Sequence, residues 1–439
     1  MQLRILSPAT RRLGLAMPFM LLMACSATRS YNDEFADVMN PYRNGQLKRA
    51  AKVMQESHSR DWRVKTNAVT LKMTYGDQAV LANLERGRLF FDAGMFSEAI
   101  EALEISETII NQDFNERAAI SARDLMSETE AVLVNQKAMP YRGFVYDQLM
   151  IGTYKSLAAA FTGDLDRALV EARRIDENQE AAIRTFKAEV AGSSSAGNAW
   201  EELSSKPGFR AKHTSFGDAD TVPASYAKFV NPYATLVKAV LRRLRNHSAE
   251  TGEVDLRNLL SMMPDNTFVA RELERCQSNE SAAGTVYVLW ENGLGPRRRS
   301  VEVAIRYGEI RAISHNFRND LEWFDTAFIA LPEFVRGKRA AKSLVVEADG
   351  RRIRSQLICN MDMVERFEFE QRMPMVLARE VARLITQETL AHEVGKIASR
   401  NKGDGDGTIE ALALVATLTY RAVVNQADDR CWKTLAADY

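Results

Sequence analysis

The sequence predicts a mainly α-helical chain in which a helical repeat precedes a small α+β domain with two β-hairpins and C-terminal helices. Over residues 26 to about 275, apolar residues recur at helical spacing, and short turns with Gly, Asn or Asp interrupt them. From Gly284 onward, apolar residues alternate with polar ones, which is typical of strands. We therefore expect a repeat domain at 25–275 and an α+β domain at 284–439.

The first 24 residues have the features of a lipoprotein signal peptide. Arg4, Arg11 and Arg12 supply positive charge, and the apolar run 13–24 is too short to cross a hydrocarbon core of roughly 30 Å as a helix. Leu22-Met23-Ala24-Cys25 resembles the bacterial lipobox, in which the cysteine thiol accepts a diacylglyceryl group before cleavage. We expect Cys25 to become the lipid-anchored N-terminus. An ordinary signal peptide that contains a cysteine is the alternative.

The expected mature chain, 25–439, is weakly acidic and has few cysteines. Removing three arginines from the 58 basic residues leaves 55 against 58 acidic ones, so the net charge is about −3. Ser26, rather than Asp, follows Cys25, and by resemblance to the lipoprotein sorting rule this indicates the outer membrane. Cys276, Cys359 and Cys431 remain, so at most one intramolecular disulfide can form in an oxidising compartment.

The clearest repeat unit runs from Asn83 to Ser106. Small residues at 87 and 99 would let two antiparallel helices approach closely, with a glycine turn between them. The spacing resembles a tetratricopeptide (TPR) helix pair and is carried by Gly87, Phe90, Gly94, Phe96, Ala99 and Leu103. The same turn-and-second-helix core recurs as Gly45, Leu47 and Ala50 and as Gly163, Leu165 and Ala168. A fourth, degenerate unit is expected between Asn231 and Asn266, with Gly252 in its turn.

Between the third and fourth units, the glycine- and serine-rich stretch near 190–223 has little periodicity and is expected to be a mobile loop. In the second half, 286–290 and 301–305 are expected to form one hairpin around the turn at 291–296. Residues 344–347 and 351–357 form a second hairpin around Asp349-Gly350. Phe328 to Leu331 adds a further strand, and two helices, 361–399 and 409–426, complete the domain.

Charge is distributed unevenly along the chain. Residues 77–138 contain 12 acids against 5 bases, whereas 296–354 contain 13 bases against 8 acids. Arg297, Arg298 and Arg299 lie on one expected hairpin and are candidate contacts for anionic lipid headgroups or an acidic partner. Solvated hairpin tips without a ligand are the alternative. The total charge is not basic, so nucleic acid is not an expected partner.

The sequence offers no catalytic or metal site. His392-Glu393 resembles part of a zinc-peptidase motif, but Lys396 stands where the second histidine ligand belongs. Residues 402–413 resemble a calcium loop, yet a lysine and an alanine occupy its first and last ligand positions. The serines at 193–195 lack the glycines of a nucleophile elbow. We expect no enzyme activity, metal or cofactor; a carboxylate pair of the glycosidase type is left open.

The segment from Tyr141 to Asp147 is the candidate partner-binding site of the repeat domain. Pro140 is expected to end the preceding helix, and the apolar residues that follow lie at helical spacing. Gly143 is expected to allow close contact with the preceding repeat. Arg142, Tyr146 and Asp147 are expected to flank this apolar face, where a partner could contact them.

Several short motifs, spread over nearly the whole mature chain, carry a family resemblance. They are Tyr141 to Asp147, Gly163-Asp164-Leu165, Asn231-Pro232-Tyr233, Gly284 to Val288 with Gly293-Leu294-Gly295-Pro296, and Ala427-Asp428-Asp429-Arg430 with Trp432. Together they resemble a family of uncharacterised Gram-negative TPR-containing envelope lipoproteins. Members are often encoded beside a lipoprotein activator of peptidoglycan synthase, which implies a setting in envelope assembly. The resemblance brings no catalytic residue.

These features lead us to expect a lipid-anchored, non-catalytic scaffold that faces the periplasm and binds envelope proteins through a groove of TPR-like helices. The alternative, from another class, is a peptidoglycan-directed enzyme or ligand-binding protein that uses a cleft between the helical and β domains. Perturbed carboxylates lining such a cleft would favour the alternative. A groove of exposed aromatic and apolar side chains would favour the scaffold.

Overall fold

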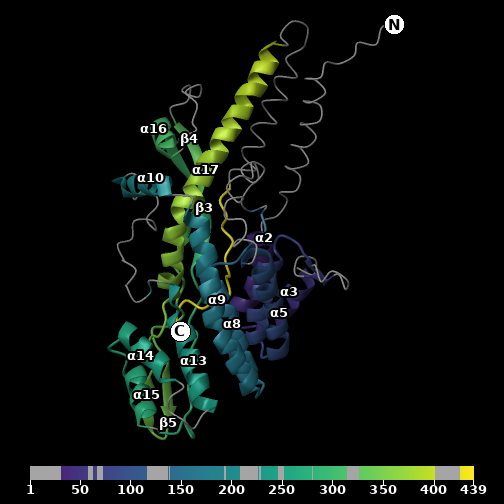
Figure 1. Cartoon of the computed structure of the whole chain (residues 1–439). Coiled ribbons are helices and arrows are strands. Elements are labelled where there is room, and N and C mark those ends of the chain that lie inside the picture. Colours follow the sequence, from purple (N-terminus) through teal and green to yellow (C-terminus); the bar gives the residue numbers. More distant parts are fainter. Residues whose placement is uncertain are drawn as a thin grey trace.

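The structure, a computed structural model, describes residues 31–439 except for 58–62, 67–72, 116–136, 138, 192–193, 208–225, 227–228, 246–251, 279, 314–325 and 401–425. Cys25 with the expected signal peptide, the calcium-like loop at 402–413 and all but the last residue of the expected helix 409–426 lie outside the described residues. The described part is mainly helical, with short antiparallel strand pairs and one long helix late in the chain (Figure 1).

Consecutive helices form hairpins in the first part of the chain. They are α2 (Tyr31–Arg43) with α3 (Leu47–Ser57), α4 (Ala79–Asp92) with α5 (Phe96–Ile109), α8 (Val145–Phe161) with α9 (Leu165–Ala191), and α13 (Pro232–Arg245) with α14 (Glu253–Met262). The second helix of each of the first three hairpins packs on the first helix of the next one. Three shorter features accompany them: the strand pair β1 (Lys65–Thr66) and β2 (Met73–Thr74), the π-helical turn η1 (Ile110–Asn115), and α15 (Thr267–Gln277), which packs on α14.

Glycines make the turns of three hairpins, as the sequence predicts. Gly45, Gly94 and Gly163 have φ angles of +72°, +74° and +85°, a left-handed conformation that side chains disfavour. Gly87 lies where α4 and α5 approach closely: a Cβ atom there would be 2.5 Å from Cγ of Leu103 and 3.3 Å from the carbonyl oxygen of residue 99. The predicted close approach of positions 87 and 99 is therefore confirmed.

Part of the stretch near 190–223 is helical rather than a loop. After α9 ends, α10 (Ser194–Ser205) begins almost at once. Its apolar side chains pack against the apolar core between α17 and the β3–β4 sheet; they are Ala199, Trp200 and Leu203. The prediction of a loop is wrong for 194–205, because burial of this face stabilises a helix that the glycine and serines alone would disfavour. Residues 208–225 lie outside the part of the chain described.

The longest strand pair differs from the predicted first hairpin. β3 (Arg297–Arg306) pairs antiparallel with β4 (Thr326–Val335), and Val301 lies opposite Leu331. α16 (Tyr307–Ile313) begins the connection between these strands. The prediction that 286–290 pairs with 301–305 is wrong, because the intervening turn is bonded elsewhere. Asn292 N donates to the carbonyl of Asp438, and Leu294 exchanges two backbone hydrogen bonds with Lys338.

The second predicted hairpin and the predicted strand around Phe328 are confirmed. β5 (Val345–Ala348) pairs with β6 (Arg351–Arg354) through the turn at Asp349-Gly350, where both residues have positive φ. The helix predicted at 361–399 is also present as α17 (Met361–Arg400). α17 packs on α10 and β4, and Figure 1 shows it continuing past the β3–β4 pair as one long rod. Among the described helices, none combines the length and apolarity that crossing a membrane requires.

The largest apolar core joins the two halves of the chain. It runs through the first three hairpins and α13, and it includes residues from the other end of the sequence: Cys359, Met361, Val364, Trp432, Leu435, Ala436 and Tyr439. A second core lies between α17 and the β3–β4 pair. The three cysteines at 276, 359 and 431 are buried, and none of them is in a disulfide. Burial of apolar side chains, not cross-linking, therefore holds the halves together.

Candidate functional site

Residues 426–439, here called the C-terminal segment (yellow in Figure 1), follow an irregular path along the helical hairpins. Several of the side chains that hold this segment come from the first helix of each hairpin. They are Tyr42 of α2, Glu85 and Arg88 of α4, Tyr154 of α8, and Tyr233 of α13. The first helices of the four hairpins therefore share one face, called the first-helix face below, and that face holds a non-helical peptide.

Glu85 makes the densest contacts with the C-terminal segment. Its carboxylate accepts the backbone amides of Lys433 at 2.7 Å and Thr434 at 3.2 Å, and the Thr434 hydroxyl at 2.5 Å. Burial raises the pKa of the Glu85 carboxyl to about 7, although its hydrogen bonds from Thr434 and Lys433 act in the opposite direction. Because two of the three donors are backbone amides, Glu85 recognises the path of the peptide more than its side chains.

Arg88 lies one helical turn further along α4 and also binds Thr434. Its Nε atom donates to the carbonyl oxygen of Thr434 at 3.2 Å. The rest of its guanidinium group pairs with Asp92 at 2.5 Å and with Glu291. Tyr233 also donates to Glu291, at 3.3 Å. This buried arginine is therefore neutralised by two carboxylates and still binds the peptide backbone.

Aromatic side chains close the far end of the first-helix face. The Tyr154 and Tyr439 hydroxyls lie 2.9 Å apart, and the Tyr439 ring stacks on that of Tyr233 with 4.1 Å between centroids. On its other side, the C-terminal segment pairs with main chain: Gly295 N donates to Leu435 O at 2.7 Å, and Cys359 exchanges two hydrogen bonds with Tyr439. The segment is thus enclosed between helices and loops, and its backbone is bonded on both sides within residues 433–439.

A second polar cluster surrounds the start of α8, where helices meet β3. The backbone amides of Val145 and Tyr146 donate to Glu368 of α17 at 2.9 and 3.4 Å. Asp147 accepts the Phe144 amide at 2.9 Å and the Tyr141 hydroxyl at 2.6 Å. Two carboxylates from different helices therefore cap the N-terminus of α8, where unsatisfied amides favour negative charge.

The cluster also contains an arginine stacked on an aromatic ring and two carboxyls whose pKa is raised. The Arg298 guanidinium lies over the Phe144 ring, 3.7 Å from its centroid. Burial raises the pKa of Asp147 to about 7, although hydrogen bonds from Tyr141 and Phe144 lower it. Burial likewise raises the pKa of Glu365 well above its ordinary value, although Arg298 opposes the shift.

The structure brings several predicted site residues together, but in the interior. Tyr146 and Asp147 are buried, so their predicted place at a partner-facing surface is wrong. They are covered by α17 and β3, which no local pattern around 141–147 indicates. Arg142 is half-buried and pairs with Glu189 at 3.8 Å. The helix starts later than predicted, because residues 141–144 precede it and α8 begins at Val145.

The three consecutive arginines lie on β3 and have different environments. Arg298 belongs to the cluster at α8, Arg299 is exposed and pairs with Glu333 of β4, and Arg297 is half-buried. Successive side chains of a strand point to opposite faces, so these three cannot form one patch. The prediction that all three contact one anionic partner is therefore wrong for Arg298.

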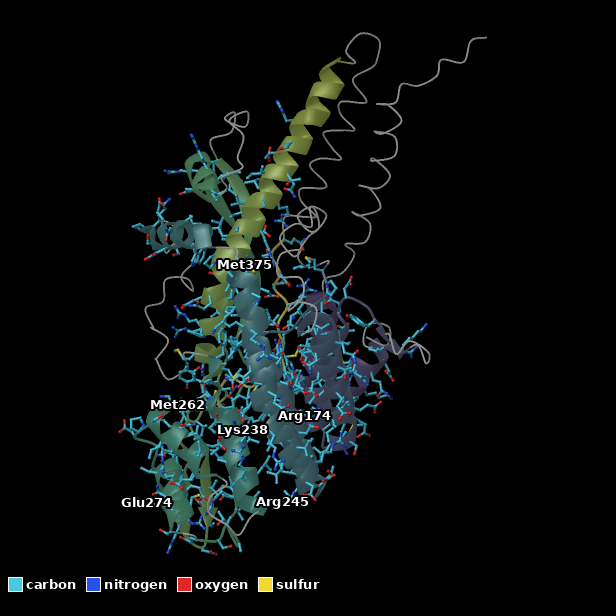
Figure 2. All side chains as sticks on the ribbon, in the orientation of Figure 1. Arg174, Lys238, Arg245, Met262, Glu274 and Met375 are labelled. Atoms are coloured by element: carbon cyan, nitrogen blue, oxygen red, sulfur yellow. The ribbon has the colours of Figure 1, made fainter. Side chains whose placement is uncertain are left out.

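A cavity of about 180 Å³ lies between α9, α13 and α14, near Lys238 and Met262 in Figure 2. Lys238 pairs with Asp176 at 2.5 Å and with Asp255 at 3.7 Å, and Asp255 also pairs with Arg242. The charged groups at this cavity therefore satisfy one another. The full lining is Leu149, Ile175, Asp176, Gln179, Val230, Asn231, Ala234, Thr235, Lys238, Asp255, Asn258 and Met262. None of these belongs to the carboxyl cluster at α8.

Sequence reasoning missed the groups that hold the C-terminal segment. Glu85 and Arg88 stand in a helix whose residues 79–90 are all buried, and a charge at such a position needs a partner. A charged residue within a buried helix was therefore the available signal in the sequence, but this signal does not identify the partner. Within the described ranges, no three His, Cys, Asp or Glu side chains are placed to hold a metal ion.

No protein-family model matches this sequence, and comparisons with curated proteins and with solved structures likewise give no match.

Proposed function

We propose that the chain is a lipid-anchored, non-catalytic scaffold of the Gram-negative periplasm, built on TPR-like helical hairpins, that binds envelope proteins. One observation carries this proposal: four successive hairpins turn their first helices to one face, and that face binds a non-helical peptide by its backbone. TPR arrays bind peptides on such a surface. The proposed likeness to TPR hairpins is also supported by the glycine turns at positions 45, 94 and 163 and by the close approach at Gly87.

The C-terminal segment already fills the part of the first-helix face around Glu85 and Arg88. Trp432, Thr434 and Leu435 are as buried as the apolar core, so replacing the segment would expose that core to water. We infer that the segment is part of the fold and fixes the hairpins in one arrangement. The scaffold proposal therefore places partner contacts on the remaining surface of the hairpins and of the C-terminal half.

The lipid anchor at Cys25 and the outer-membrane location complete the proposal. Both rest on the lipobox and on Ser26, which precede the described residues. Acyl chains would hold the scaffold at the membrane, because each buried CH₂ contributes ~0.8 kcal/mol. On the basis of the family resemblance, we further propose that the scaffold acts in envelope assembly, in the setting of peptidoglycan synthesis.

Photo-crosslinking in intact Gram-negative cells tests the scaffold. A photo-reactive amino acid would replace Phe161, Val170 or Leu244 in turn, three apolar side chains that are exposed on α8, α9 and α13. We expect at least one position to give a discrete crosslink to an envelope protein. The matched control carries the probe at Leu103, which is fully buried and should give none. Absence of crosslinks from all exposed positions would contradict the proposal.

The alternative, a peptidoglycan-directed enzyme or ligand-binding protein, is favoured by one observation. Asp147 and Glu365 have raised pKa values and lie at the junction of α8 with α17 and β3. Such perturbed carboxyls are common at active sites, but structural networks produce them as well. Calorimetric titration of the mature chain with soluble peptidoglycan fragments separates the two: saturable binding that Glu365→Gln abolishes would favour the alternative.

A further inference from the structure

Residues 286–290, here called the edge segment, have the sequence of a strand but no partner strand. They read Val-Tyr-Val-Leu-Trp, without charge, proline or glycine. Side chains alternate: Val286 and Val288 are 84% and 54% exposed, whereas Tyr287 and Leu289 are turned toward the protein. No large apolar side chain among the described residues is more exposed than Val286.

The backbone of the edge segment is free. Its amides and carbonyls make no hydrogen bond to any residue in the part of the chain that the structure describes. Folded proteins usually protect such an apolar edge with charge, proline, a bulge or a covering element, because an open edge templates pairing with another strand. The edge segment contains no charged residue and no proline, so its sequence does not protect it in this way.

Contacts on the inner side hold the edge segment against α15. The Tyr287 hydroxyl donates to Glu272 of α15 at 2.6 Å, and Arg275 donates to the Thr285 hydroxyl at 2.9 Å. At the other end, Glu291 is paired with Arg88, and Asn292 is bonded to the backbone of Asp438. Because both ends are fixed, an incoming strand would meet an ordered edge and lose less entropy on binding.

We propose that the edge segment adds one β-strand from a partner protein, an extended peptide with apolar side chains at alternate positions. Backbone hydrogen bonds would supply the affinity, and contacts with Val286 and Val288 would supply the preference for apolar residues. This inference rests on the proposed function, since it names where the scaffold takes a partner.

A flexible partner segment fits the edge better than a second copy of this chain. Five paired residues bury far less than the ~1,200 Å² typical of a stable interface between folded proteins. A flexible peptide can follow the surface beyond both ends of the edge segment and gain further contacts there. Two rigid copies joined through this edge could not adapt their surfaces in the same way.

Amide hydrogen exchange of the purified mature chain tests the inference. The probe is a short peptide in which valine and threonine alternate; a version with proline at its centre is the matched control. We expect the first peptide to slow exchange at every second residue of the edge segment, because one edge of a strand bonds alternate residues. The proline version should not, because it interrupts the ladder.

Substitutions at the edge segment complete the test. Val286→Lys with Val288→Lys should weaken peptide binding by about tenfold, since two apolar cross-strand contacts are lost. Val254→Lys, at a 67% exposed valine on α14, should leave it unchanged. No protection by the peptide, or equal binding by the lysine variants, would overturn the inference. Self-association through this edge, measured by analytical ultracentrifugation and abolished by the lysines, would replace the partner strand with a second copy.

The scaffold proposal and the inference about the edge segment can be rejected independently of each other. A crosslink from Phe161 that persists in the double lysine variant, without peptide protection, would retain the scaffold and reject the edge. Peptide protection without any crosslink in cells would retain the edge and reject the scaffold in its proposed form.

Discussion

The Glu368 carboxylate accepts the backbone amide of Val145 at 2.9 Å, so a residue of α17 caps the start of α8 from 223 positions away in sequence. The other oxygen of Glu368 pairs with Arg372, which also reaches Glu189 of α9 at 2.7 Å. One buried carboxylate therefore links α8, α9 and α17. The relative placement of the two halves of the chain depends on this link as well as on apolar packing.

Replacing Glu368 with alanine should lower the free energy of unfolding by about 3–5 kcal/mol, because it leaves two helix amides without their acceptor and removes one of the two carboxylates that pair with Arg372. Urea denaturation followed by circular dichroism measures the change. Glu347→Ala serves as the control, since Glu347 and Arg352 form an exposed pair on the β5–β6 hairpin that contributes only ~0–1 kcal/mol. Equal effects of the two substitutions would show that the capping contact is unimportant.

Stability should decrease as the pH rises through the range in which three buried carboxyls titrate. Burial raises the pKa values of Glu85, Asp147 and Glu380 to about 7. Below that pH, the folded protein retains protons that the unfolded chain, with ordinary carboxyl pKa values, has already released. The unfolding free energy should therefore be higher at a pH of about 5.5 than at about 7.5, by linkage.

Glu85→Gln identifies the contribution of one carboxyl to that pH dependence. The variant should flatten part of the slope, because the amide does not titrate, whereas Glu347→Gln at the exposed hairpin should leave the slope unchanged. Denaturation series at both pH values provide the comparison. A stability that rises steadily from pH ~5.5 to ~7.5 would contradict the raised pKa values.

The sequence predicts those features that depend on neighbouring residues. Gly94 and Gly163 mark turns because a left-handed backbone needs glycine, and Gly87 marks a close approach because α5 follows after a turn. The turn at Asp349-Gly350 is predicted correctly for the same reason. Strand pairing is different: the partner of Val301 is Leu331, and no local signal favours it over the nearer Val288. The choice depends on where Asn292 bonds, which is a tertiary contact.

The candidate site was predicted less well than the fold, because burial comes from distant segments. Around Tyr146 and Asp147 the local pattern is that of an amphipathic helix start, and only α17 and β3 make it interior. Trp432 was recognised as part of a motif, but its position against Tyr154 required the whole arrangement of hairpins. A charged residue within an otherwise buried helix, such as Glu85, shows that a partner exists without showing which.

The lipobox predicts that Cys25→Ser leaves the protein unacylated and free of the membrane fraction, because serine cannot form the thioether to the diacylglyceryl group. Metabolic labelling with a fatty-acid analogue and fractionation of cell envelopes give the two readouts. Ser26→Asp is the companion variant, since it retains acylation and should redirect sorting away from the outer membrane. Normal labelling of the serine variant would show that the anchor is elsewhere or absent.

Gly143 offers the sharpest test of the entry into α8. Its φ angle is +76°, and a Cβ atom there would lie 3.1 Å from Cδ1 of Ile110, so both the backbone and the space favour glycine. Gly143→Ala should lower the unfolding free energy by ~1–2 kcal/mol through backbone strain. Gly143→Leu should add overpacking of ~1–3 kcal/mol. The matched control is Gly197→Ala in α10, where nothing lies within 4 Å of the added atom and helix propensity should raise stability slightly. A Gly143→Leu protein that melts like the parent would mean that η1 and the entry into α8 are not packed as closely as described.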